Sequence, residues 1–204
     1  MQLNNVDAYE KAFSNVLSEK PSKITLLYQL SSILNDSNNG KLFALIKNTA
    51  HKGIENKSPI AFSYFLVLVG TEHYKGGEFW SAVWNILNLP PKPSRQTDWG
   101  NLFIEVLNKY NLPHFEDERA LKYVTPILGH GGIPNYCLPD FFEKLLLPII
   151  NGEIETSSTS IGEILQDWKR CSSLFATADK PVYRFLLHGG KVANDFLTRC
   201  IQVA

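Results

Sequence analysis

The sequence predicts an all-α protein that forms an irregular multi-helix domain or a series of stacked helix pairs. Two observations predict this fold class. Apolar residues recur every three or four positions through most of the chain, and prolines, glycines and asparagines interrupt these runs at the expected helix ends. We expect about eight to ten helices, with at most a short strand or two in the proline-rich corners.

The first part of the chain, residues 1–89, is predicted to form an N-terminal helical subdomain. Its polar run at residues 35–40 predicts a turn. The run Ile60–Val69 is apolar on nearly every side, so we expect it to form a helix at the centre of the core. Helices are expected within residues 6–17, 21–34, 41–50, 60–69 and 79–87.

The proline-rich segment at residues 89–94 is the predicted boundary inside the chain, because clustered prolines cannot continue a helix. Residues 94–204 are expected to form a C-terminal helical subdomain that packs on residues 1–89 within one continuous domain. Its first helix is expected to start near Trp99, with Thr97 or Asp98 as the N-cap.

The stretch from residue 123 to residue 150 is predicted to be the hub of the core, because it carries many aromatic and aliphatic side chains at a sharp corner. An apolar helical run ends at His130-Gly131-Gly132, where the glycines can adopt the positive φ of a left-handed cap. Two prolines then hold the chain extended before a second apolar run begins at Phe141.

Charge and cysteine content limit the class of protein. Lysine plus arginine and aspartate plus glutamate total 20 each, so no overall field attracts the chain to nucleic acid or to an acidic membrane. The most apolar run is too short to span a bilayer, and the first residues lack the pattern of a secretory signal. We therefore expect a cytoplasmic protein with no membrane partner and with three reduced cysteines.

The His130-Gly131-Gly132 sequence matches the oxyanion loop of esterases, in which glycine N–H groups stabilise a developing alkoxide. An esterase also needs a nucleophile in a G-x-S-x-G turn, and this sequence has none. A histidine in the last turn of a helix, favoured by the helix dipole and followed by a glycine cap, explains the same residues.

A thiol enzyme is a second catalytic alternative at this corner. It would pair Cys137 with His130 or His188, and Asp140 would orient the imidazole. However, Cys137 lies in an apolar stretch, where a thiol is usually inert packing. The same four residues include metal-ligand types, but no pair has the short, regular spacing of zinc ligands, so we predict no metal and no cofactor.

The last third of the chain is locally basic, with Trp168 and Tyr183 interleaved among its cations, which is a pattern found in nucleic-acid-binding surfaces. A solvated helix face explains the same charges and is the favoured interpretation. The candidate nucleic-acid-binding residues are Lys169, Arg170, Arg184, Lys191 and Arg199.

Three segments together resemble the N-terminal helical regions of large uncharacterised bacterial multidomain proteins. They are FWSAVWNILNLP, the helix that contains Trp99, Gly100 and Phe103, and YVTPILGHGGIPNYCLPDFF. The resemblance extends from Phe79 to Phe142. It implies no activity and no functional residue, but it implies that the chain is the N-terminal part of a longer protein.

The sequence favours a non-enzymatic function, that of a helical scaffold or recognition module of a larger bacterial protein. Such a module would bind protein partners or the downstream domains of its own chain. Two alternatives remain open. The basic region from Lys169 to Arg199 could bind nucleic acid, or His130, Cys137 and Asp140 could converge in an open cleft as the site of an enzyme.

Overall fold

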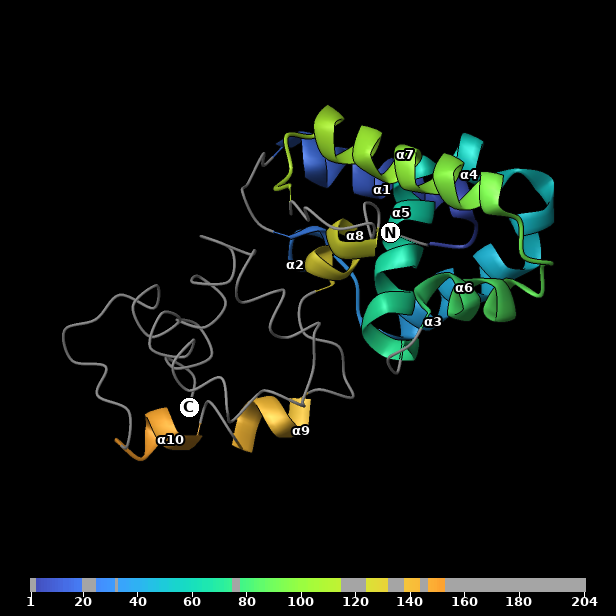
Figure 1. Cartoon of the computed structure of the whole chain (residues 1–204). Helices are drawn as coiled ribbons and strands as arrows, with labels where there is room; N and C mark the ends of the chain where they lie inside the picture. The colour runs from blue at the N-terminus through green and yellow to red at the C-terminus, as the bar shows by residue number, and fades with distance from the viewer. Residues whose placement is uncertain are drawn as a thin grey trace. The chain divides into compact units, whose positions relative to one another are not determined.

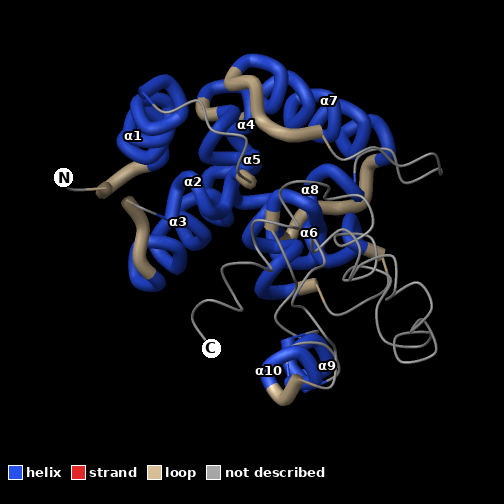
Figure 2. Tube along the Cα trace, turned by 90° about the vertical axis from the view of Figure 1, so that its left-hand side faces the viewer, coloured by secondary structure: helices blue, strands red, loops and turns tan. Residues whose placement is uncertain are grey.

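The structure is a computed structural model, and it describes residues 3–19, 25–31, 33–74, 78–114, 124–131, 138–143 and 147–152 (Figure 1). Every regular element in these ranges is helical, which confirms the predicted all-α fold class. Figure 2 shows these helices and the loops that join them. The chain forms two compact units, residues 1–132 and residues 133–204.

The described helices are divided between the two units. Described helices of the second unit are α9 (Leu138–Phe141) and α10 (Leu147–Ile150). None of the described helices combines the length and the apolar character needed to cross a bilayer. The first unit contains α1 (Val6–Glu19), α2 (Leu26–Ser31), α3 (Asp36–Thr49), the 3₁₀ turn η1 (Ala50–Lys52), α4 (Ile54–Lys57), α5 (Pro59–Leu68), the π-helical turn η2 (Val69–His73), α6 (Phe79–Leu87), α7 (Pro93–Lys109) and α8 (Val124–His130).

Helix α5 is the centre of the first unit. Every side chain from Ile60 to Leu68 is buried, and α5 packs against α1, α2, α3, α4, α7 and α8. Figure 1 shows α1 and α7 along one side of α5 and α3 and α6 along the other. A helix that is apolar on all sides can be buried on all sides, so the prediction of a central helix at this segment is confirmed.

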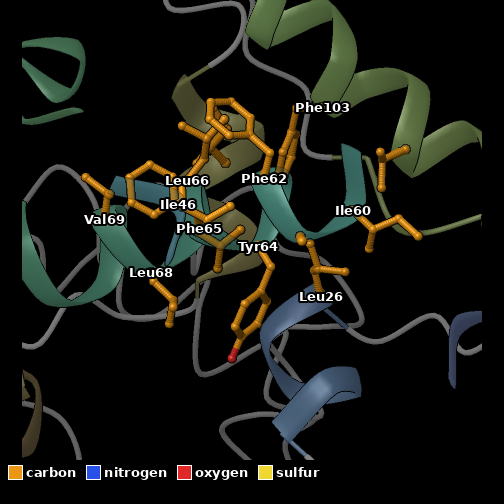
Figure 3. Close-up of a cluster of buried hydrophobic side chains, with 14 of the residues drawn as sticks. Leu26, Ile46, Ile60, Phe62, Tyr64, Phe65, Leu66, Leu68, Val69 and Phe103 are labelled. Carbon is orange, nitrogen blue, oxygen red and sulfur yellow. The ribbon is translucent and has the colours of Figure 1, made fainter. Parts of the chain in front are cut away.

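The core around α5 draws side chains from helices far apart in the sequence. Figure 3 shows Phe62, Phe65 and Leu66 of α5 in one buried cluster with Leu26 of α2, Ile46 of α3 and Phe103 of α7. Burial of such side chains is the main favourable term in folding, at about 1.5–3 kcal/mol for each large apolar group.

The prediction that residues 123–150 form the hub of the core is wrong for the described part of that stretch. Helix α8 does contribute Ile127 and Leu128 to the core of the first unit, where it packs against α5. Leu138, Phe142 and Ile150 are exposed by 41%, 48% and 44%. The central position belongs instead to α5, whose ten residues are apolar on every face.

The proline-rich segment at residues 89–94 lies inside the first unit, and the break between the two units falls after Gly132. Helices on either side of this segment pack together. The ring of Trp99 on α7 lies 5.0 Å from that of Phe62 on α5, in an edge-to-face arrangement. The prolines therefore turn the chain back onto the same core, since a break in helical structure does not require a break in packing.

Helix α3 begins earlier than the sequence predicts. Its first residue is Asp36 rather than Lys41, so most of the polar run 35–40 is helical. The Asn35 side chain accepts a hydrogen bond of 2.9 Å from the backbone N–H of Asn38 and thereby caps the helix. The asparagines that suggest a turn thus act as the start signal of a helix.

Helix α7 also begins earlier than predicted. It starts at Pro93, so Thr97 and Asp98 lie inside the helix and do not cap it. Proline suits the first helical position because its missing N–H would have no partner there. No side chain caps this helix start: the N-cap residue, Lys92, makes no side-chain hydrogen bond to the first turn.

Two glycines allow α8 to lie close to the end of α5. A Cβ atom on Gly70 would lie 2.8 Å from Cδ2 of Leu128, and one on Gly131 would lie 3.3 Å from the carbonyl oxygen of Val67 and in contact with Oγ1 of Thr71. Gly131 does not have the positive φ that the sequence analysis predicts. Its role is therefore close packing at the end of α8 rather than a left-handed cap.

Candidate functional site

His130, the central residue of both catalytic hypotheses, is completely buried at the end of α8. Its Nδ1 atom accepts a hydrogen bond of 2.9 Å from the backbone N–H of Leu26, and its Nε2 atom lies 2.8 Å from the carbonyl oxygen of Pro113. Because Nδ1 is the acceptor, the geometry assigns the proton of the neutral ring to Nε2, which donates it to Pro113.

The surroundings of His130 keep its imidazole neutral. Burial lowers the pKa of His130 to about 4 from its ordinary value of 6.5; the hydrogen bond to Pro113 acts in the opposite direction, and nearby His114 lowers the pKa further. The Phe103 ring packs edge-on against the imidazole, with 5.7 Å between ring centroids. Both ring nitrogens are thus engaged with backbone groups, in the manner of a structural histidine.

The other residues that the sequence suggests as partners of His130 lie largely outside the described residues. Cys137 and His188 lie outside the described residues, as do Cys171 and Cys200. Asp140 lies in α9, but the description does not extend to its side chain. All five candidate nucleic-acid-binding residues, from Lys169 to Arg199, also lie outside the described ranges.

A groove between α4 and α7 is the candidate binding site of the first unit. It encloses about 440 Å³, within the size range of ligand-binding pockets. The α7 residues recur every three or four positions and so share one face of that helix. The groove is lined by Glu55 and Asn56 on one side and by Lys92, Arg95, Asp98, Trp99, Asn101, Leu102 and Glu105 on the other.

The five charged side chains of this groove carry both signs, and they do not pair with one another. Lys92 and Arg95 lie at the start of α7, Asp98 and Glu105 follow along the helix, and Glu55 faces them from α4. None of the five forms an ion pair with a described residue. The Oε2 atom of Glu55 is buried and has no hydrogen-bond partner among the described residues. The groove therefore has unused hydrogen-bonding and charge-pairing capacity on both walls.

The floor of the groove is rigid. Trp99 is 2% exposed and packs against Trp84 and Phe62, with ring centroids 4.8 Å and 5.0 Å away. Aromatic contacts of this kind fix ring orientation and add about 0.5–1.5 kcal/mol per pair beyond the burial of area. A ligand in the groove would therefore meet a preformed surface that needs little ordering on binding.

The groove carboxylates do not make a metal centre. Within the described ranges, no group of three or more histidine, cysteine, aspartate or glutamate side chains could hold a metal ion. Glu55, Asp98 and Glu105 are thus too dispersed for all three to share one metal ion. Their spacing is better suited to hydrogen-bond donors distributed along an extended ligand.

This groove is not among the sites that the sequence predicts. Part of the signal was present, because Arg95, Asp98, Leu102 and Glu105 recur at helical spacing and mark one polar-edged face. The opposite wall was not predictable, since α4 is only four residues long and shows no helical period. Its position opposite α7 depends on long-range packing around α5.

Comparisons with known proteins give no match: no protein-family model, no curated protein and no solved structure matches this chain.

Proposed function

We propose that the first unit, residues 1–132, is a non-enzymatic recognition module that binds a segment of a partner protein in the groove between α4 and α7. The observation that carries this proposal is the set of five charged side chains, of both signs, along one rigid groove, none of which forms an ion pair with another described residue. Complementary charges supplied by a partner would give specificity and fix the register of binding.

The polarity of the groove favours a peptide segment over a small apolar ligand. Pockets for small molecules are usually lined mainly by apolar and aromatic side chains. Here charged and carboxamide side chains predominate, and Trp99 and Leu102 are the exceptions. An extended peptide offers main-chain and side-chain hydrogen-bonding groups along its whole length, which matches such a lining.

Charge also argues against nucleic acid as the occupant of this groove. Lys92 and Arg95 supply two positive charges, whereas Glu55, Asp98 and Glu105 supply three negative charges. Phosphate groups would be repelled by the three carboxylates, and the groove lacks the excess of cations that nucleic-acid binding requires.

An enzymatic role for His130 is disfavoured by its contacts. A general base needs a nitrogen that can reach the substrate, directly or through one water molecule. Both nitrogens of His130 are hydrogen-bonded to backbone groups inside the core, and the residue has no exposed surface.

Site-specific photocrosslinking of the full chain tests the proposal. A benzophenone amino acid replaces Asn56, an exposed residue of the groove, or Lys47, an exposed residue of α3 outside it, in cells that produce the protein. We expect a discrete adduct from position 56 and none from position 47. Reversal of two groove charges, Arg95→Glu with Glu105→Lys, should abolish the adduct.

The captured protein is then purified and titrated against the chain and against the charge-reversed variant by calorimetry. Saturable binding that the charge reversal eliminates supports the proposal. The proposal is wrong if position 56 gives no adduct, if positions 47 and 56 give the same adducts, or if the adduct survives charge reversal.

A further inference from the structure

We propose that the groove recognises an extended segment in which an acidic side chain and an arginine lie about four residues apart. This inference rests on the proposed function and specifies the chemistry of the partner. It follows from the separation of charge along α7, from the two carboxylate-bearing walls and from the uncapped start of that helix.

The cationic and anionic ends of the groove are separated by a defined length. Arg95 and Glu105 are ten residues apart on one continuous helix. At 1.5 Å of rise per residue, their backbone positions are about 15 Å apart. An extended peptide advances about 3.3 Å per residue, so four to five residues cover about the same distance.

The start of α7 suits an acidic side chain. The side chains of Lys92 and Arg95 make this end of the groove positive, and neither is paired with a described carboxylate. The positive end of the helix dipole lies at the same end of α7 as these two cations. The N-cap residue of this 17-residue helix makes no side-chain hydrogen bond to the first turn. A carboxylate of the partner would supply the missing negative charge.

The carboxylates suit an arginine. Glu55 on α4 and Glu105 on α7 line the groove from different helices, and neither forms an ion pair with a described residue. A guanidinium group has five N–H donors in a planar fork and can serve two carboxylates at once. A lysine ammonium is a compact charge and matches such a pair less well.

Fluorine NMR on the full chain tests this inference. The four tryptophans are replaced by 5-fluorotryptophan, and a Trp99→Phe variant identifies the Trp99 signal. The probe is an acetylated and amidated heptapeptide of the sequence glycine, glutamate, serine, glycine, serine, arginine, glycine. We expect the Trp99 signal to shift saturably as the peptide is added. A peptide that leaves this signal unmoved overturns the inference.

Three control peptides isolate the chemistry. Citrulline replaces arginine with the same shape and no charge, glutamine replaces glutamate, and a permuted peptide places glutamate next to arginine. Each control should bind about tenfold more weakly, because each loses a charge-assisted contact at one end of the groove. Equal binding of the citrulline or the permuted peptide overturns the inference.

Protein variants provide the reciprocal control. Glu105→Gln should weaken the probe about tenfold, whereas Glu19→Gln, at an exposed position at the end of α1, should leave binding unchanged. The Glu105→Lys variant should bind a peptide with a second glutamate in place of arginine more tightly than it binds the probe. A loss of structure would not produce this reversal of peptide preference. Absence of that reversal contradicts the assigned anionic end.

The two proposals fail in different ways. If the position 56 crosslink is charge-dependent but the control peptides bind as well as the probe, the groove is a partner site and the acid–arginine spacing is wrong. If no charge-dependent crosslink forms, the proposed function itself is wrong.

Discussion

Nδ1 of His130 lies 2.9 Å from the backbone nitrogen of Leu26, a residue 104 positions earlier in the chain. The same imidazole reaches the carbonyl oxygen of Pro113 through Nε2, at 2.8 Å. One buried side chain thus joins the start of α2, the end of α8 and the loop after α7. Unsatisfied backbone groups in a core are costly, so this histidine serves two groups that no helix satisfies.

Replacement of His130 by phenylalanine should destabilise the first unit. The change leaves the N–H of Leu26 and the carbonyl of Pro113 buried without these partners, and we expect a loss of about 2–4 kcal/mol in the free energy of unfolding. Urea denaturation of the full chain measures it. His51→Phe is the matched control, because His51 is exposed and its replacement should change stability by less than about 0.5 kcal/mol. Equal stability of the His130→Phe variant and the parent chain would contradict the joining role.

Stability should fall as pH is lowered through the range in which His130 resists protonation. The pKa of His130 is about 4 in the folded chain and near 6.5 when unfolded, so between these values the unfolded state binds more protons. The stabilising contribution is complete above pH 6.5 and is lost progressively as pH falls towards 4. A shift of this size corresponds to roughly 3 kcal/mol.

Comparison with His130→Gln isolates this pH effect. Glutamine can accept and donate hydrogen bonds but does not titrate. The difference in free energy of unfolding between parent and variant should therefore shrink or reverse as pH falls from 6.5 to 4, measured by urea titrations at each pH. A difference that is constant across this range would show that His130 is not the titrating group.

The sequence was sufficient for the features that depend on local pattern. The helical fold, the position of α6 and the central place of α5 follow from apolar spacing alone. The start of α3 was predicted wrongly because Asn35 and its neighbours fit a turn and a cap equally well. The groove was missed because its walls, α4 and α7, meet only through long-range packing.

The hydrogen bonds of His130 could not be predicted from the sequence either. A histidine before two glycines fits an oxyanion loop, a helix end or a buried hydrogen-bonding residue. Its partners, Leu26 and Pro113, have no sequence signal that links them to it. Tertiary packing decides among these alternatives, since neither partner is local.

Glu10 of α1 provides the cap that α5 lacks in its own sequence. Its carboxylate oxygens accept hydrogen bonds from the backbone N–H groups of Ala61 (2.8 Å) and Ile60 (3.2 Å). Glu10→Ala should cost about 1–2 kcal/mol, as expected for loss of an N-cap. Burial raises the pKa of Glu10, and the two backbone hydrogen bonds act in the opposite direction. Glu10→Gln, which keeps an acceptor, should therefore cost less than Glu10→Ala.

Chemical denaturation of the two Glu10 variants checks this order. Lys11→Ala is the control, because Lys11 is the exposed neighbour of Glu10 on the same helix. If Glu10→Ala and Lys11→Ala have the same stability, the capping contact contributes nothing measurable.

Gly131 and Gly40 should respond in opposite directions to the same substitution. A Cβ on Gly131 contacts Oγ1 of Thr71 and lies 3.3 Å from the carbonyl oxygen of Val67, so Gly131→Ala should force α8 away from the end of α5. Overpacking of this kind costs about 1–3 kcal/mol. Gly40 is exposed within α3 and a Cβ there has no neighbour within 4 Å, so Gly40→Ala should stabilise the chain by about 0.5–1 kcal/mol.

Thermal and urea unfolding of both variants distinguish crowding from backbone entropy. Thr71→Ala, combined with Gly131→Ala, should recover part of the lost stability, because it removes the nearest contacting atom while the backbone oxygen of Val67 remains. The recovery is partial also because Thr71 loses its contacts with the carbonyl oxygens of Val67 and Gly131, each at 3.0 Å. If Gly131→Ala stabilises the chain as Gly40→Ala does, α8 has room for a side chain at this position and the close approach of α8 to α5 is wrong.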